Sequence, residues 1–240
     1  MKAFSEYART EFDFRGHAAT LVKPDVPCED GRWAIYTEYF GAFPGVAEAL
    51  LERGWHIAGL RNIHRWGCVQ DQENRLAFLD AMEKEYGLSH RVAIIGMSCG
   101  GLHGIHFAAY RPERISAMYL DAPVVNLLSC PLAYGRKAER NEDMVRECLA
   151  ALGKTESEML SYRENPLDVM HIPAEAKIPL VLVYGDADPV VPYSENGALL
   201  EKLYRECGAP LECYGKHGCA HHPHGLPDSK PIADFLEKYR

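Results

Sequence analysis

The chain of 240 residues contains no apolar run that approaches the length needed to span a bilayer, so no membrane span is expected. Its first seven residues lack the apolar stretch of a signal peptide, which favours a cytoplasmic location. Acidic residues outnumber basic residues, with 34 Asp and Glu and 26 Lys and Arg, which gives a net charge of −8. No basic stripe is available to neutralise phosphates, so nucleic acid is not expected as a partner.

The eight cysteines are irregularly spaced and include no C-x-x-C pair, which matches neither a disulfide framework nor a standard metal motif. Because no export signal is found, we expect them to be free thiols. The chain also lacks internal repeats, low-complexity tracts and an obvious linker. Its length suits a single domain with a large core, which we expect over residues 1–240.

What the sequence does contain is an alternation of strand and helix patterns. Short apolar, β-branched runs predict strands, and the stretches between them predict helices. This alternation predicts an α/β fold whose mostly parallel central sheet is covered by helices on both faces, with ligand sites at the carboxyl ends of the strands. The expected strands cover 7–14, 18–22, 33–36, 56–60, 91–95, 117–120, 179–184 and 211–214, and the expected helices cover 46–53, 76–86, 102–110, 195–207 and 232–238.

The segment of about residues 126–177 interrupts this alternation. Asn141 and Gly153 are suitable ends for one short helix, and Thr155 with Glu158 forms a capping box that opens a second. Helices inserted at this place would overhang the active edge of the sheet as a lid, or would pack there without any gating role. The sequence leaves both interpretations open.

Residues 96–101, Gly-Met-Ser-Cys-Gly-Gly, hold the pattern G-x-S-x-G between a predicted strand and a predicted helix. This arrangement is typical of the nucleophile elbow of α/β-hydrolases, in which a tight turn raises a serine hydroxyl above the sheet. The flanking glycines permit so tight a turn. Ser98 is therefore the candidate nucleophile, and an α/β-hydrolase fold with a short helical lid insertion is the expected architecture.

A serine nucleophile needs a base and an acid that orients the base, and in this fold the order along the chain is Ser, acid, His. Asp186 and Asp188 both follow the predicted strand 179–184. Asp188 is favoured because its spacing matches the hydrolase pattern G-x-x-D-x-x-V, whereas Asp186 suits a turn. Asp121, after the strand 117–120, is a third candidate.

The base is expected in the loop after the last strand, where four histidines compete. His221 is favoured, because a glycine three residues ahead of the histidine is usual in this loop. His217, His222 and His224 are the alternatives, and His222 is expected to line the substrate pocket. Trp66, in the loop after strand 56–60, is a second expected substrate contact.

An oxyanion hole needs two backbone N–H groups. One is expected from Cys99, directly after the nucleophile, and the other from Glu38 or Tyr39 in the loop after strand 33–36. The Cys99 side chain is expected to turn away from the site as a buried filler rather than to act as a thiol nucleophile.

The same histidines suggest a rival metal site, because His-rich tracts often bind metals. Cys213 and Cys219 lie close by in the sequence and extend the possible ligand set. The spacings fit no standard zinc template, however, and a metal site would leave the elbow serine unexplained. We therefore expect no metal and no cofactor.

Several segments together resemble one bacterial group, the α/β-hydrolases related to prolyl-oligopeptidase-like and acyl-esterase domains. The resemblance covers most of the chain from Trp33 onward, and the His-His-Pro-His run is its most specific part. It implies an esterase-type serine hydrolase with Ser98, Asp188 and His221 as the triad and no metal. Cys99 departs from the group, in which a larger polar or basic residue is more usual. The segments are 39–44, 96–101, 121–124, 184–188, 191–192, 195–196 and 221–226.

The predicted activity is cleavage of a small-molecule carboxylic ester through an acyl-serine intermediate. One alternative is a serine peptidase of the prolyl-oligopeptidase-like type, and another is a catalytically retired scaffold that serves only for binding. An intact serine, acid and histidine argue against the retired scaffold. The sequence determines neither the physiological substrate nor the oligomeric state.

Overall fold

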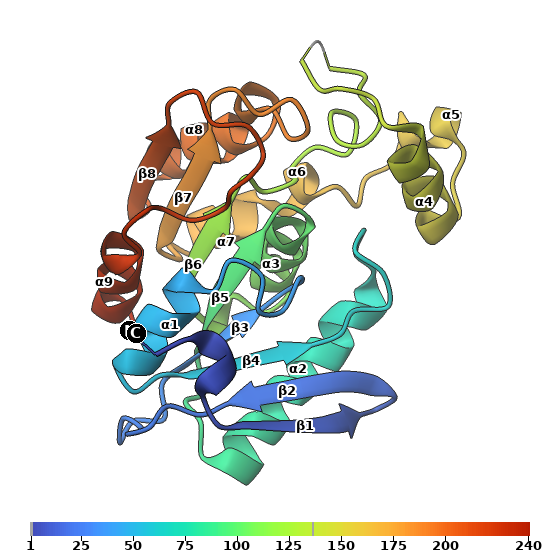
Figure 1. The fold of residues 1–240 in the computed structure, drawn as a ribbon. Helices are drawn as coiled ribbons and strands as arrows, with labels where there is room; N and C mark the ends of the chain where they lie inside the picture. The colour runs from blue at the N-terminus through green and yellow to red at the C-terminus, as the bar shows by residue number, and fades with distance from the viewer. Residues whose placement is uncertain (1, 136) are drawn as a thin grey trace.

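The computed structural model describes residues 2–135 and 137–240. At its centre lies one sheet of eight strands in the order β1-β2-β4-β3-β5-β6-β7-β8 (Figure 1). The first two contacts, β1 with β2 and β2 with β4, are antiparallel, and the remaining neighbours are parallel. The expected α/β fold with a mostly parallel sheet is therefore confirmed. The strands are β1 Arg9–Phe14, β2 His17–Val22, β3 Trp33–Tyr36, β4 His56–Leu60, β5 Val92–Met97, β6 Ile115–Asp121, β7 Leu180–Gly185 and β8 Leu211–Lys216.

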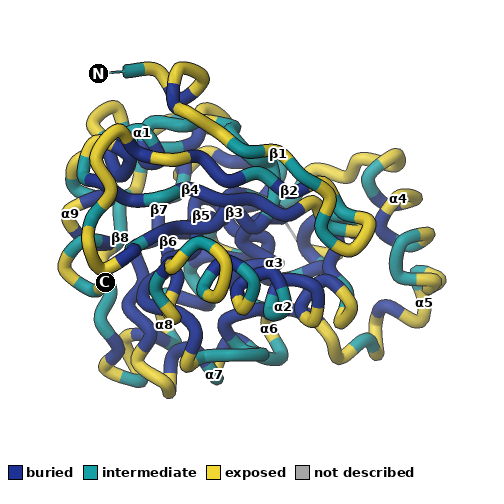
Figure 2. Tube along the Cα trace, turned by 90° about the horizontal axis from the view of Figure 1, so that it is seen from below, coloured by how far each residue is buried: buried dark blue, intermediate teal, exposed yellow. Residues whose placement is uncertain are grey.

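Helices cover both faces of the sheet, because the central strands are apolar on both sides. In β5, Ile94 packs on one face with residues of α2, α3 and α8, whereas Ile95 packs on the other face with residues of α1 and α9. Figure 2 shows the central strands buried between these two layers. The helices are α1 Gly45–Glu52, α2 Val69–Tyr86, α3 Cys99–Tyr110, α8 Gly197–Cys207 and α9 Lys230–Lys238, with short 3-10 helices η1 Phe4–Glu6, η2 Pro112–Arg114 and η3 Tyr193–Glu195.

Among its described residues, the segment between β6 and β7 holds four helices, where the sequence predicted two. Both predicted helices are present: α4, Glu142–Leu152, is capped by Asn141, and α5, Glu156–Met159, opens with the Thr155 capping box. The two additional helices are α6, Pro166–Val169, and α7, His171–Glu175, which are too short to show a helical period. Figure 1 shows α4 and α5 standing apart from the sheet, beyond its carboxyl edge. Residue 136, inside the expected insertion, lies outside the described residues.

Two further features of the described residues concern the cysteines and the possibility of a membrane-spanning helix. All eight cysteines lie among the described residues, and each is free, as expected. Within the described ranges, no helix is both long enough and apolar enough to cross a membrane.

Candidate active site

Ser98 stands between the end of β5 and the first residue of α3, in a backbone conformation of φ 52° and ψ −119°. Such a conformation is strained for a residue with a side chain and persists only where its surroundings enforce it. Its N–H donates to the carbonyl of Asp121 at 2.9 Å, and its carbonyl accepts from Val124 at 3.0 Å. A side chain at Gly101 would meet Pro123, since an added Cβ would lie 2.3 Å from the proline Cβ. The glycine therefore lets the elbow pack directly against the segment after β6.

Ser98, His221 and Asp188 form a continuous chain of hydrogen bonds. His221 Nε2 lies 3.1 Å from Ser98 Oγ, and His221 Nδ1 lies 2.7 Å from Asp188 Oδ2. The other carboxylate oxygen of Asp188 accepts from the N–H groups of Val190 and Val191 at 2.8 and 2.9 Å. Burial by itself raises the pKa of Asp188, but these hydrogen bonds and the electrostatic interaction with His221 outweigh it and keep the pKa below its usual range. Asp188 is therefore a charged acceptor, which places the proton of the neutral imidazole on Nδ1 and leaves Nε2 free to accept.

The competing aspartate of the same loop, Asp186, has a different partner. Its Oδ2 lies 2.9 Å from His217 Nδ1, and its Oδ1 accepts a hydrogen bond from the N–H of Gly218 at 2.7 Å. These two bonds lower the pKa of Asp186. Both side chains of this pair are exposed, so Asp186 and His217 anchor the turn after β8 and lie outside the site.

The third aspartate, Asp121, also has a histidine partner. His224 Nδ1 lies 2.9 Å from Asp121 Oδ1, and both side chains are almost fully buried. Asp121 Oδ2 accepts from the N–H of Gly225 at 2.6 Å and from the hydroxyl of Tyr119 at 3.0 Å. A second carboxylate–imidazole pair therefore lies beside the first.

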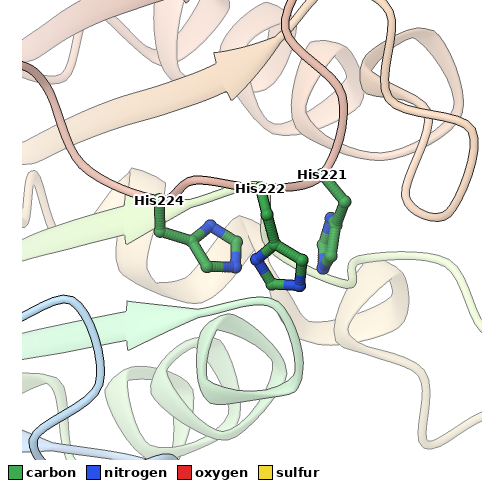
Figure 3. Close-up of side chains that lie close together, drawn as sticks. All are labelled: His221, His222 and His224. Carbon is green, nitrogen blue, oxygen red and sulfur yellow. The ribbon is translucent and has the colours of Figure 1, made fainter.

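His221, His222 and His224 gather in one cluster on the loop after β8 (Figure 3). Their ring centres are 4.8 to 4.9 Å apart. His222 is exposed and stacks on Phe43 with 5.5 Å between ring centres and an interplanar angle of 11°. Burial, together with the neighbouring His221 and His224, lowers the pKa of His222. His222 is therefore neutral around pH 7.

A cavity of about 390 Å³ opens in front of Ser98. One wall comes from α4 of the insertion, through Met144. Arg65, on another wall, pairs with Glu147 of α4, and its Nε donates to the carboxylate at 2.8 Å. The insertion thus closes over one side of the cavity and is tied to the loop after β4. The lining residues are Tyr39, Ala42, Phe43, Arg65, Met97, Ser98, Cys99, Met144, Val190, His221, His222 and His224.

The structure corrects the expectation for Trp66. Its side chain is only 1% exposed and packs in the apolar cluster that includes Leu102 and Val145. The cavity wall at this place is formed by Arg65, which precedes it. Arg65 and Trp66 lie in a turn, and the Arg65 guanidinium covers the Trp66 ring with 5.1 Å to its centre, so the indole is buried beneath the arginine. Trp66 is therefore a core residue and His222 is a cavity residue.

The expected oxyanion donors lie around the elbow. Cys99 is the first residue of α3, so its N–H has no partner within the helix. Tyr39 lines the cavity, whereas the Glu38 carboxylate turns away and accepts from Asn62 at 2.6 Å. None of the three N–H groups donates to another of the described residues. The Cys99 side chain is 1% exposed, and burial raises the pKa of its thiol to about 11, so it is no thiolate nucleophile at neutral pH.

Comparison with known families agrees with this geometry. The chain matches the model of the prolyl oligopeptidase family over residues 51–239, which is more than half of its length. It belongs to the prolyl oligopeptidase family. The resemblance inferred from the sequence segments is thereby confirmed, and so is the α/β-hydrolase fold. A comparison with curated proteins finds no match.

Solved structures that resemble this family member include peptidases and an esterase. A putative dipeptidyl aminopeptidase IV from Bacteroides ovatus has a TM-score of 0.73 at 14% identity, and the match covers 98% of this chain and 36% of that one. The acylaminoacyl peptidase of Pyrococcus horikoshii has the same TM-score and identity, with 98% and 41% covered. Est1E from Butyrivibrio proteoclasticus has a TM-score of 0.68 at 18% identity, with 96% and 98% covered. The chain thus spans less than half the length of those two peptidases.

Sequence reasoning missed two contacts of this prolyl oligopeptidase family member. One is the pair of Asp121 and His224, both of which were named as candidates but never as partners. The other is the pair of Arg65 and Glu147, which joins the insertion to the cavity wall. The position of Asp121 at the end of a predicted strand was a usable signal for the first. No sequence signal relates Arg65 to a residue so far along the chain.

Proposed function

We propose that this chain hydrolyses carboxylic esters through an acyl-serine intermediate. The observation that carries the proposal is the hydrogen-bonded series Ser98, His221 and Asp188, of which Ser98 and His221 line an open cavity. A serine hydroxyl is a weak nucleophile until a neighbouring base takes its proton. Here His221 Nε2 is positioned as that base, and the buried carboxylate of Asp188 orients it.

In the first half of the reaction, Ser98 Oγ attacks the ester carbonyl as its proton passes to His221 Nε2. The imidazolium that forms is stabilised by Asp188, which remains ionised. His221 then returns the proton to the leaving alcohol, and the acyl group stays on Ser98. In the second half, water replaces the alcohol, and the same proton transfers release the carboxylic acid.

The negative charge that develops on the carbonyl oxygen requires donors near Ser98. We assign the Cys99 N–H as one donor, since it starts helix α3 and carries the positive end of the helix dipole. Tyr39 is the better of the two candidates for the second donor, because it lines the cavity and Glu38 does not. Tyr39 has a positive φ of 53°, which is a strained backbone conformation of the kind found at functional sites.

Peptide cleavage is the second candidate function, because family membership and the resemblance to two peptidases favour it. The same triad supports attack on an amide, with His221 protonating the leaving amine. We favour an ester substrate, since the likeness to the esterase Est1E extends over nearly the full length of both chains. The cavity is lined largely by apolar and aromatic side chains, which suits a small-molecule acyl group.

A panel of activated acyl esters and aminoacyl anilides tests this proposal. Turnover of the esters that is abolished in Ser98→Ala, with little turnover of the anilides, is the expected result. The matched control is Ser5→Ala, which changes an exposed serine of η1 that does not line the cavity. Preferred cleavage of anilides would establish the peptidase instead. An inert parent chain whose Ser98 resists fluorophosphonate labelling would point to a retired scaffold.

A further inference from the structure

The three histidines beside Ser98 have the spacing of a metal site. His221, His222 and His224 each offer one ring nitrogen, and these atoms lie within 4.8 Å of one another. Imidazoles that share one tetrahedral zinc ion at 2.0–2.1 Å have ring centres roughly 5 Å apart. The observed ring centres are 4.8 to 4.9 Å apart. The side chains must still draw together on binding, because nitrogens that share one tetrahedral zinc ion lie about 3.3 Å apart.

Two of these histidines already have the outer partners that metal-binding histidines require. Asp188 and Asp121 each accept a hydrogen bond from Nδ1 of their histidine, at 2.7 and 2.9 Å. A carboxylate on Nδ1 fixes the tautomer in which Nε2 carries the lone pair, and it makes that nitrogen a stronger ligand. His221 and His224 therefore both present the ligand nitrogen on the side away from their carboxylates.

The charge around the cluster favours a cation. Asp121 and Asp188 are only 1% exposed at their side chains, so their negative charges are little screened by solvent. Lys216 offsets part of this charge, since its Nζ lies 3.9 Å from Asp121 Oδ2. Two buried carboxylates against one ammonium group leave a net negative field at the imidazoles.

His222 is the histidine of the cluster that an ion can reach directly from solvent. Its side chain is exposed, and its ring nitrogens make no hydrogen bond to another residue within the described ranges. Stacking on Phe43 holds the ring over the cavity. An ion arriving from solvent therefore meets a free imidazole first and two carboxylate-oriented imidazoles behind it.

We propose that His221, His222 and His224 bind a divalent transition-metal ion of the zinc type, and that the bound ion switches hydrolysis off. The lone pair of His221 Nε2 that binds the ion is the one that accepts the Ser98 proton, so one imidazole cannot do both. Ser98 then keeps its proton and does not attack. The ion acts as a reversible inhibitor and takes no part in the reaction. Inhibition rests on the proposed function, whereas metal binding does not.

Metal titration of the purified, tag-free chain tests the binding. We expect one Co²⁺ or Zn²⁺ per chain by calorimetry, with tetrahedral visible absorption bands for Co²⁺ and no binding of Mg²⁺. His222→Ala, at an exposed position that does not endanger folding, should weaken Kd at least tenfold, and Asp121→Asn should weaken it by about 10- to 100-fold. The matched control is His217→Ala in the same loop, which should keep the parent Kd. Absence of saturable binding, or a Kd unchanged in His222→Ala, overturns the proposal.

Ester hydrolysis with Zn²⁺ tests the switch. At free Zn²⁺ about ten times Kd, activity should fall about tenfold, and a chelator should restore it. Binding without inhibition, or activity that requires the metal, overturns the inhibitory role. Ser98→Ala should still bind the metal, so the binding result stands even if the parent chain shows no ester hydrolysis and the proposed function fails.

Discussion

Gly185 ends β7 directly against the loop that carries His221, and a methyl group here should separate the candidate base from the candidate nucleophile. A Cβ added to Gly185 would lie 2.3 Å from the carbonyl oxygen of Cys219 and 2.4 Å from that of Ala220. The N–H of Ala187 donates to the same Cys219 carbonyl at 3.0 Å, so the two loops are joined at this point. Gly185→Ala forces them apart.

The size of the effect follows from these distances. Ordinary contact begins at 3.4 Å, so the loop before His221 must move by about 1 Å. The bond from Ser98 Oγ to His221 Nε2, now 3.1 Å, would then exceed hydrogen-bonding range. A displacement of this size in a catalytic group costs roughly 100-fold in rate. Overpacking of the contact should also lower the free energy of unfolding by about 1–3 kcal/mol.

The assay is kcat for an activated ester, measured beside the urea midpoint of unfolding. Gly208→Ala is the matched control, because its added Cβ would meet no atom within 4 Å. Its positive φ of 61° costs about 1–2 kcal/mol of strain but leaves the site untouched. A Gly185→Ala enzyme with kcat within threefold of the parent would refute the argument that this contact positions His221.

Three further predictions follow from the site and its surroundings. Asp188→Asn should lower kcat by about 10⁴-fold, because the imidazole loses its orienting charge, whereas Asp186→Asn should change it less than threefold; equal losses in the two variants would contradict the assignment. Trp66→Ala should lower the free energy of unfolding by about 3–5 kcal/mol, as a core residue does, and denaturant titration measures this. Burial lowers the pKa of His106 from 6.5 to about 4. The unfolded chain therefore binds this proton more tightly than the folded chain. The free energy of unfolding falls as the pH drops from about 6.5 to about 4. Between pH 7 and pH 5 this contribution is about 2 kcal/mol, and His106→Gln should lose it; an unchanged pH dependence in that variant would disprove it.

The local parts of the fold were predictable from the sequence. Apolar, β-branched runs identified the strands, and the Asn141 cap and the Thr155 capping box identified α4 and α5. These features depend on neighbours a few residues away, which a sequence displays directly. Boundaries were less well predicted: α2 begins at Val69, ahead of the periodic apolar positions, because its first turns are polar. The helices α6 and α7 were not predicted, since four or five residues are too few to show the helical period of apolar positions.

The expectation for Trp66 failed for a different reason. The sequence places it in a loop at the active edge, where Arg65 and Trp66 are equally near the cavity. Side-chain direction decides between them, and it depends on how that loop packs against α3 and the insertion. The structure buries the indole against Leu102 and leaves the guanidinium in the cavity wall.

By itself, the sequence determined the elbow at Ser98, because the motif and its flanking strand and helix are contiguous. It also placed three aspartates and four histidines on loops at the carboxyl edge of one sheet. The sequence favoured Asp188 and His221 among these candidates, and the structure joins the two by a hydrogen bond. Only the tertiary structure decided that Asp121 holds His224 and that Asp186 holds His217. The pairing depends on the register at which loops from β6, β7 and β8 meet above the sheet. That register is set by strand pairing across the whole domain, and no local pattern records it.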